Sequence, residues 1–130
     1  AVMGDLAFLH DAMSLGRGLR EKEADLQVIV VDDDGGAIFS HLEYAHTTAS
    51  GRFERFYTAP QCASISALAA ALGARVHVPE SVAALQALLD EPVSGLSVII
   101  WEVESRAGPE MLSPGAVPYP CLTSGQHEQR

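Results

Sequence analysis

Residues 26–36 read LQVIVVDDDGG, and this stretch decides the fold. Its first six residues form an almost unbroken apolar run rich in β-branched side chains, which is typical of a parallel strand buried on both faces. The run ends in three aspartates and two glycines, a composition that favours a turn. The stretch therefore predicts a central strand that is followed directly by an acidic, glycine-rich turn.

Further strands and helices are predicted on both sides of this run. Strands are expected at residues 1–3, as the end of a strand that is cut short, and at 74–78 and 96–103. Helices are expected from Asp5 to about Gly16, from Cys62 to Leu72 with Gly73 as the C′ residue, from Ser81 to Leu89, and briefly after the glycine pair. Alternation of this kind implies right-handed crossovers. The expected fold class is α/β, with three layers, a mainly parallel sheet and helices on both faces.

Two segments lack such a pattern. Residues 43–61 are polar and contain Gly51 and Pro60, so we expect a long surface loop there. Residues 107–130 contain four prolines and no periodicity, which predicts a disordered tail. Residues 1–106 are accordingly expected to form one domain, truncated at its N-terminus.

The composition excludes several classes of function. The 130 residues carry a formal net charge of −9, from 17 acidic and 8 basic side chains. Such a surface repels nucleic-acid phosphates and anionic membranes, so neither partner is expected. No stretch approaches the ~20 apolar residues that span a bilayer, and no export signal is visible. We therefore expect a cytoplasmic protein.

Two acidic motifs follow strands, at the sheet edge where α/β proteins bind ligands. Gly4-Asp5 follows the first strand, and Asp33 follows the strand at residues 26–31. If these strands are neighbours, Asp5 and Asp33 converge. Carboxylates suit Mg²⁺, and glycine-flanked helix N-termini offer N–H groups to phosphate, so the pair predicts a metal bridged to a diphosphate. The alternative is an ordinary Asp-Gly turn, with Asp5 as an N-cap.

The two motifs together resemble the thiamine-diphosphate motif, which opens with Gly-Asp and closes one helix and one strand later with Asn-Asn or a near equivalent. Three longer segments point to one family among the thiamine-diphosphate enzymes: residues 4–11 (GDLAFLHD), 34–42 (DGGAIFSHL) and 53–60 (FERFYTAP). As a set, over about residues 1–106, they are similar to the 2-succinyl-5-enolpyruvyl-6-hydroxy-3-cyclohexene-1-carboxylate synthase family. The usual Asn-Asn reads Asp32-Asp33 here, which keeps an oxygen ligand and adds negative charge.

The resemblance implies a site for thiamine diphosphate and Mg²⁺ (or Mn²⁺). Asp5, Asp33 and the main-chain carbonyl of Gly35 would hold the metal. The implied cofactor-binding set is Gly4, Asp5, Leu6, Asp33, Gly35, Gly36, Ile38 and Phe39. Ile38, Phe39 and Leu42 match family positions that form an apolar wall beside the thiazolium and the substrate. A stripe of this kind is equally typical of core packing.

The resemblance also implies an activity and its partners. The family is a thiamine-diphosphate-dependent transferase (carboxylic-acid synthase) of menaquinone biosynthesis, which decarboxylates 2-oxoglutarate and adds the succinyl semialdehyde unit to isochorismate. A pyrimidine-binding domain, from the other subunit of a homodimer, completes the family's active site. The 130 residues have no room for that domain. We therefore expect a C-terminal fragment of a longer, homo-oligomeric enzyme, inactive by itself.

Two alternatives stay open from the sequence. One is a fragment of another thiamine-diphosphate enzyme, either acetohydroxyacid-synthase-like or a 2-oxoacid decarboxylase. In most such enzymes the cofactor motif begins with Gly-Asp-Gly, whereas this chain has Gly4-Asp5-Leu6 at that place. The other is a non-catalytic α/β assembly domain, which would not respond to thiamine diphosphate.

Overall fold

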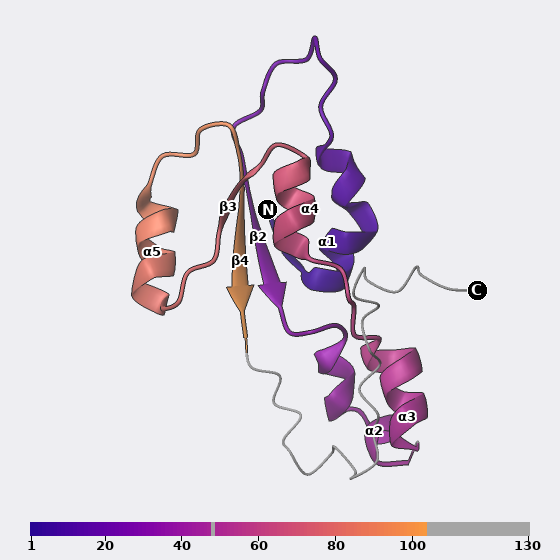
Figure 1. Ribbon diagram of the computed structural model, residues 1–130. Coiled ribbons are helices and arrows are strands. Elements are labelled where there is room, and N and C mark those ends of the chain that lie inside the picture. The colour runs from indigo at the N-terminus through magenta and orange to yellow at the C-terminus, as the bar shows by residue number, and fades with distance from the viewer. Residues whose placement is uncertain (48, 104–130) are drawn as a thin grey trace, which may run out of the picture.

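The computed structural model describes residues 1–47 and 49–103. Four strands, β1 (Val2–Gly4), β2 (Leu26–Asp32), β3 (Arg75–His77) and β4 (Leu96–Glu102), form one parallel sheet in the order β1-β2-β4-β3 (Figure 1). Strand β2 pairs with β1 on one side and, along its whole length, with β4 on the other. The prediction of a central strand at this position is therefore confirmed.

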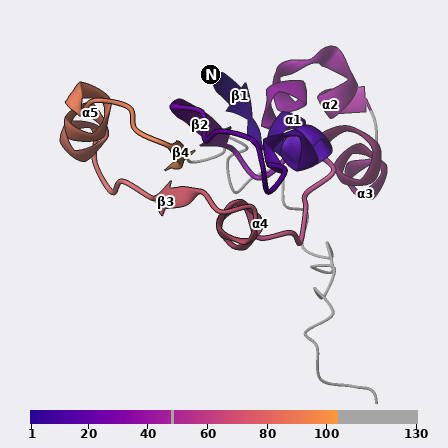
Figure 2. The same cartoon turned by 90° about the horizontal axis from the view of Figure 1, so that it is seen from above.

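The helices lie on both sides of the sheet, as right-handed crossovers require. Helices α1 (Asp5–Asp11) and α4 (Ile65–Ala71) cover one face, and α5 (Val82–Asp90) lies on the opposite side (Figures 1 and 2). The steps from β1 to β2 and from β2 to β3 run in one direction across the sheet, and the step from β3 to β4 runs back. The reversal carries α5 to the other face, and the predicted α/β class is confirmed.

Local capping residues set the helix boundaries. Helix α1 ends at Asp11 and continues as a 3-10 turn over Ala12–Leu15, so the helix expected up to Gly16 is only partly α-helical. Helix α4 begins three residues later than expected, because the Ser64 hydroxyl accepts a hydrogen bond from the N–H of Ala67 at 3.1 Å. Ser81 caps α5 in the same way, with Ala84 as donor at 3.2 Å.

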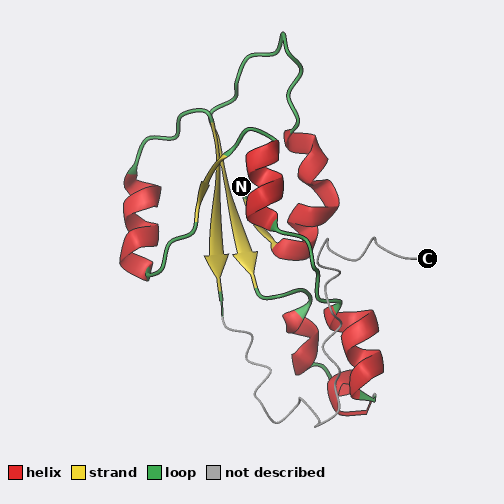
Figure 3. Cartoon of the chain, viewed as in Figure 1, coloured by secondary structure: helices red, strands yellow, loops and turns green. Residues whose placement is uncertain are grey.

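The prediction of a long loop over residues 43–61 is wrong. This segment contains α2 (Glu43–Thr47), α3 (Ser50–Phe53) and a π-helical turn (Glu54–Thr58), and Figure 3 shows it as largely helical beyond the carboxyl ends of the strands. A 3-10 turn over Ala37–His41 precedes it. Among the described side chains of this segment, Ala45 and Phe53 are the buried apolar ones. Such short helices bury too few side chains to show a clear period in the sequence.

The core lies between the sheet and the helices α1 and α4. Its buried members are Phe8, Ala12, Val28, Val30, Ile65, Ala69, Val98 and Ile100. Helix α5 buries no residue fully, so the opposite face of the sheet is covered more thinly. Within the described residues, no helix is both long and apolar enough to cross a membrane. The predicted tail, residues 107–130, and the domain boundary at residue 106 lie outside the described residues.

Candidate functional site

The two acidic motifs meet at the carboxyl edge of the sheet. Strands β1 and β2 are parallel neighbours, with Gly4 opposite Val31, so α1 begins beside the turn that follows β2. Asp5, the first residue of α1, is only 4% exposed. One carboxylate oxygen, Oδ2, accepts a hydrogen bond from the N–H of Gly35 at 2.5 Å, and the other accepts from the N–H of Leu6 at 2.7 Å. The carboxylate therefore ties the opening motif to the closing one.

The start of α1 differs from the simple N-cap alternative. Gly4, in an extended conformation, is the N-cap residue, and Asp5 occupies the first helical position. The Asp5 side chain accepts a hydrogen bond within the first turn of its own helix, from Leu6, and also one from Gly35, thirty positions away. The next residue, Leu6, is half-buried. A single carboxylate thus holds two strand ends together, and the remaining lone pairs of its oxygens stay available to a cation.

The turn after β2 has a tightly specified backbone. Asp32 accepts a hydrogen bond from the N–H of Asp34 at 3.2 Å, and Asp34 and Gly35 have φ of +64° and +112°. A Cβ on Gly35 would overlap the carbonyl oxygen of Thr58. A Cβ on Gly36 would lie 2.5 Å from the carbonyl oxygen of Tyr57. The glycine pair is therefore required by the approach of a distant backbone segment as well as by the turn.

The turn is electrostatically unbalanced. Loss of solvation, then the negative charges of Asp5 and Asp32, raise the pKa of Asp33 above its ordinary value, and the backbone N–H of Ala37 offsets part of this shift. The pKa of Asp34 is raised by loss of solvation and by Asp32 and Asp5. The side-chain charges that raise these two pKa values, those of Asp5 and Asp32, are both negative. A divalent cation at this position would relieve the repulsion between them.

The donor set fits Mg²⁺ together with a diphosphate. Among residues 1–47 and 49–103, no three His, Cys, Asp or Glu side chains are grouped so that they could hold a metal by themselves. A metal here would depend on the carboxylates of Asp5 and Asp33, on the Gly35 carbonyl and on oxygens of a ligand. Mg²⁺ is usually bound in this way, through one or two carboxylates and substrate phosphates.

Asp33→Asn is expected to stabilise the chain near neutral pH. Because the pKa of Asp33 is higher in the folded chain than its ordinary value, the folded state binds the proton more tightly than the unfolded state. The protonated Asp33 side chain therefore contributes to stability below the ordinary pKa, and this contribution is lost as the pH rises through the raised pKa. Asparagine stays neutral and keeps the contribution at every pH. Urea unfolding should show a higher free energy of unfolding for Asp33→Asn at about pH 7 and little change at about pH 3. An equal gain for Asp90→Asn, an exposed carboxylate on α5, would contradict this cause.

The apolar stripe near the turn is exposed. Ile38 is 71% exposed, and Phe39 and Leu42 are also exposed large hydrophobic residues. The core-packing alternative is therefore wrong for the described part of the chain. The Phe39 ring meets the Tyr57 ring edge to face, with centroids 6.1 Å apart. The three side chains lie just after Gly36, where they are available to a bound molecule or a partner surface.

The sequence did not predict that residues 53–58 contact the glycine turn at Gly35 and Gly36. The N–H of Gly36 donates a hydrogen bond to the carbonyl of Thr58 at 2.6 Å. Phe53 stacks on Tyr57, with centroids 5.2 Å apart and an interplanar angle of 16°. The aromatic run within residues 53–57 is the only signal of this contact in the sequence, and it does not reveal the partner.

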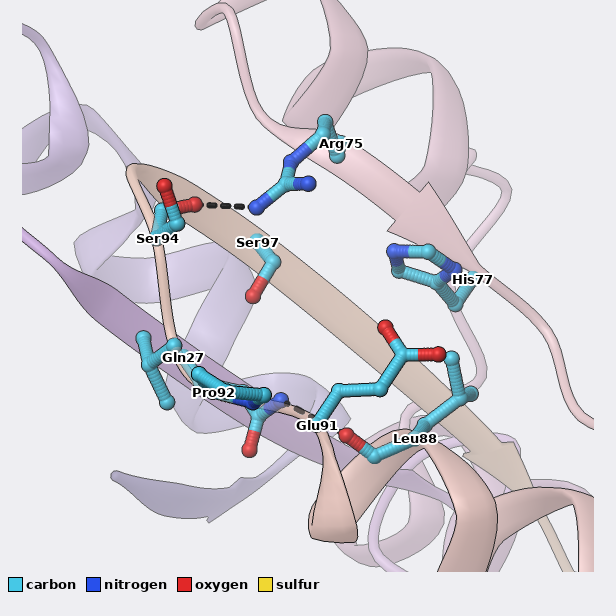
Figure 4. Close-up of a pocket in the computed structure, with 9 residues that line it drawn as sticks. Gln27, Arg75, His77, Leu88, Glu91, Pro92, Ser94 and Ser97 are labelled. Atoms are coloured by element: carbon cyan, nitrogen blue, oxygen red, sulfur yellow. Dashed lines mark hydrogen bonds between the residues drawn. The ribbon is translucent and has the colours of Figure 1, made fainter.

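A pocket lies at the opposite end of the sheet. It lies between β3, β4 and the segment after α5, and Gln27, Arg75, His77 and Ser97 are among its lining residues (Figure 4). The Arg75 guanidinium donates a hydrogen bond to the Ser94 carbonyl. Gln27 and Ser97 each stand second in their strand, so the pocket is at the amino ends. It is therefore distinct from the acidic site, and no residue predicted from the sequence lies in it.

Curated relatives of this chain share one name. The chain is 39% identical over 111 residues to the 2-succinyl-5-enolpyruvyl-6-hydroxy-3-cyclohexene-1-carboxylate synthase of Paenarthrobacter aurescens, a match covering 82% of this chain and 19% of that protein. It is 43% identical over 101 residues to the synthase of Rhodococcus erythropolis, covering 76% and 18%. The synthase of Kineococcus radiotolerans is 42% identical over 98 residues, covering 75% and 18%.

No protein-family model matches the sequence. The chain spans about a fifth of the length of the curated relatives just described. Within that part, the matches cover about three quarters or more of the chain, well beyond the short acidic motifs. The resemblance to the 2-succinyl-5-enolpyruvyl-6-hydroxy-3-cyclohexene-1-carboxylate synthases that the motifs indicated is therefore confirmed.

Proposed function

We propose that this chain is the C-terminal part of a thiamine-diphosphate-dependent synthase, and that its acidic turn binds the diphosphate of the cofactor through Mg²⁺ or Mn²⁺. The hydrogen bond from the Gly35 N–H to the Asp5 carboxylate carries this proposal. It brings the two halves of the motif together at the carboxyl edge of a parallel sheet, where such proteins bind ligands. The shared name of the curated relatives supports the synthase assignment.

Each residue has a definite part in the proposed site. Asp5 and Asp33 would hold the metal with their carboxylates, and Gly35 would hold it with its main-chain carbonyl. The N-terminus of α1, at Gly4 and Leu6, and the backbone beside Gly36 would face the diphosphate. Thiamine diphosphate, when bound, supplies the electron sink for decarboxylation.

The exposed stripe has a separate role in the proposal. Ile38, Phe39 and Leu42 would form one wall beside the reacting end of the cofactor and the substrate. Large apolar side chains there exclude water, and a low local polarity favours the loss of carbon dioxide from a charged carboxylate. Their exposure in this chain is consistent with a surface that a ligand or another domain covers.

The reaction and the partners proposed for the whole protein are those that the resemblance to the synthases implies. The complete enzyme would decarboxylate 2-oxoglutarate and add the succinyl semialdehyde unit to isochorismate, a transferase step of menaquinone biosynthesis in the cytoplasm. A pyrimidine-binding domain, contributed by the other subunit of a homo-oligomer, would complete the site. The chain alone would then bind the diphosphate end of the cofactor without turnover.

Calorimetric titration of thiamine diphosphate in the presence of Mg²⁺ tests the proposed site. We expect Mg²⁺-dependent heat with thiamine diphosphate and none with thiamine, which has no diphosphate. Asp33→Ala should weaken the binding by at least about tenfold, because it removes a metal ligand. Asp90→Ala, an exposed carboxylate at the end of α5, is the matched control and should bind like the wild type. Binding that needs no metal, or that survives Asp33→Ala, would contradict the proposal.

A further inference from the structure

The Gly35–Gly36 peptide connects the proposed metal site to a distant segment. The N–H of Gly36 donates to the Thr58 carbonyl at 2.6 Å. The carbonyl of Gly35, the proposed main-chain ligand of the metal, belongs to the same planar peptide unit. In a trans peptide the C=O and N–H point in opposite directions. The direction of the Gly36–Thr58 hydrogen bond therefore sets the direction of the Gly35 carbonyl.

The other side of Gly35 is held as well. Its own N–H donates to the Asp5 carboxylate at 2.5 Å. Both peptide units that flank the Gly35 Cα thus have a fixed hydrogen-bond partner, one on α1 and one on the π-helical turn. These two bonds hold Gly35 at φ of +112°, a conformation open essentially to glycine. Hydrogen bonding of the Gly36 N–H also polarises the peptide, which makes the Gly35 oxygen a better ligand.

The Thr58 carbonyl is free to accept this bond because of how its own turn ends. The π-helical turn over Glu54–Thr58 closes with the Ala59 N–H donating to the Glu54 carbonyl at 2.7 Å, and Ala59 has φ of +42°. The last carbonyls of a helical turn have no partner within it. A π-helical turn and a left-handed alanine are uncommon, and the surrounding packing must maintain them.

That packing comes from an aromatic stack. Phe53 is buried and stacks on Tyr57, and Tyr57 in turn meets Phe39 edge to face. Phe39 lies three residues after Gly36, so the stack joins the π-helical turn to the same segment that the Thr58 carbonyl contacts. Tyr57 stands in the middle of the stack, next to Thr58, and its loss would release the turn from both rings.

We propose that Tyr57 is a positioning residue for the metal: by fixing the Thr58 carbonyl against the Gly36 N–H, it sets the Gly35 carbonyl in the direction that binds Mg²⁺. This inference rests on the proposed cofactor site and adds the element that sets its metal affinity. Tyr57 itself need not touch metal or cofactor. Its effect is carried through one hydrogen bond and one peptide plane.

The test compares three variants of the chain. Tyr57→Leu removes the ring, Tyr57→Phe keeps it, and Phe56→Leu removes a neighbouring ring that is largely exposed. The Mg²⁺ concentration for half-saturation is measured by calorimetry at a fixed thiamine diphosphate concentration. The rate of amide hydrogen exchange at Gly36 is measured by NMR without ligand, which reports on the hydrogen bond to Thr58 directly.

Tyr57→Leu should raise the half-saturating Mg²⁺ concentration about tenfold and accelerate exchange at Gly36, whereas Tyr57→Phe and Phe56→Leu should behave like the wild type. If the wild type binds and Tyr57→Leu keeps its Mg²⁺ requirement and its Gly36 exchange rate, the positioning role is overturned while the proposed function stands. If the wild type shows no Mg²⁺-dependent binding, the proposed function is overturned, and the positioning role with it. Loss of Gly36 protection in Phe56→Leu as well would also overturn the role, since the effect would not depend on the stack.

Discussion

Replacement of Gly35 by alanine is expected to destabilise the folded chain by about 3 kcal/mol or more and to abolish Mg²⁺-dependent binding of thiamine diphosphate. Two effects add. The φ of +112° is strained for any residue with a Cβ. The new methyl group would also overlap the carbonyl oxygen of Thr58, which belongs to the backbone and cannot rotate away. Urea unfolding followed by circular dichroism measures the loss of stability.

Two other glycines separate these effects. Gly73 has φ of +87°, but a Cβ there would meet nothing within 4 Å, so Gly73→Ala should show the backbone strain alone, about 1–2 kcal/mol. Gly51 lies in α3 with open space around it, and Gly51→Ala should be neutral or slightly stabilising. If Gly35→Ala costs no more than Gly73→Ala, the close approach of Thr58 to the turn is contradicted.

Phe8→Ala is expected to destabilise the chain by about 3–5 kcal/mol, the usual cost of removing a buried phenylalanine. The Phe8 side chain is 1% exposed and belongs to the core between α1, α4 and the sheet. A single domain has only about 5–15 kcal/mol of stability, so this change takes up a large part of it. The same urea titration measures the effect, with cofactor absent so that binding does not compensate.

Phe56→Ala is the matched control for this prediction. Phe56 is 67% exposed, and its ring carries the Arg55 guanidinium 5.2 Å above its centroid. An exposed cation–π pair contributes about 0.5–1 kcal/mol, so the control should lose no more than that. A comparable loss in both variants would mean that the described core does not account for the stability of the chain.

The Asp5–Asp33 pair shows how far the sequence reaches into the candidate site. The position of each residue after an apolar run places it at the carboxyl end of a strand, whatever the rest of the fold. Whether the two meet depends on strand order, which no local pattern reports. In the structure β1 and β2 are neighbours, and the Asp5 carboxylate accepts a hydrogen bond from the N–H of Gly35.

Local patterns determined the elements that bury one clear face or end in a distinct residue. The strand at residues 26–31 and the end of α4 just before Gly73 are of this kind, because a buried strand selects apolar side chains and a left-handed backbone selects glycine. The helices over residues 43–58 are too short to produce a clear pattern in the sequence, and Ala45 and Phe53 are the buried apolar residues among their described side chains.

By itself, therefore, the sequence determined the α/β class, the acidic turn and the resemblance to one family of synthases. Only the tertiary structure decided the strand order, the exposure of Ile38 and its neighbours, and the contact of Thr58 with the glycine turn. The physical reason is the range of the interactions. Helix and strand patterns arise from residues a few positions apart. The hydrogen bond between Gly36 and Thr58 joins backbone groups that every residue type except proline carries, so no pattern of side chains in the sequence can predict it.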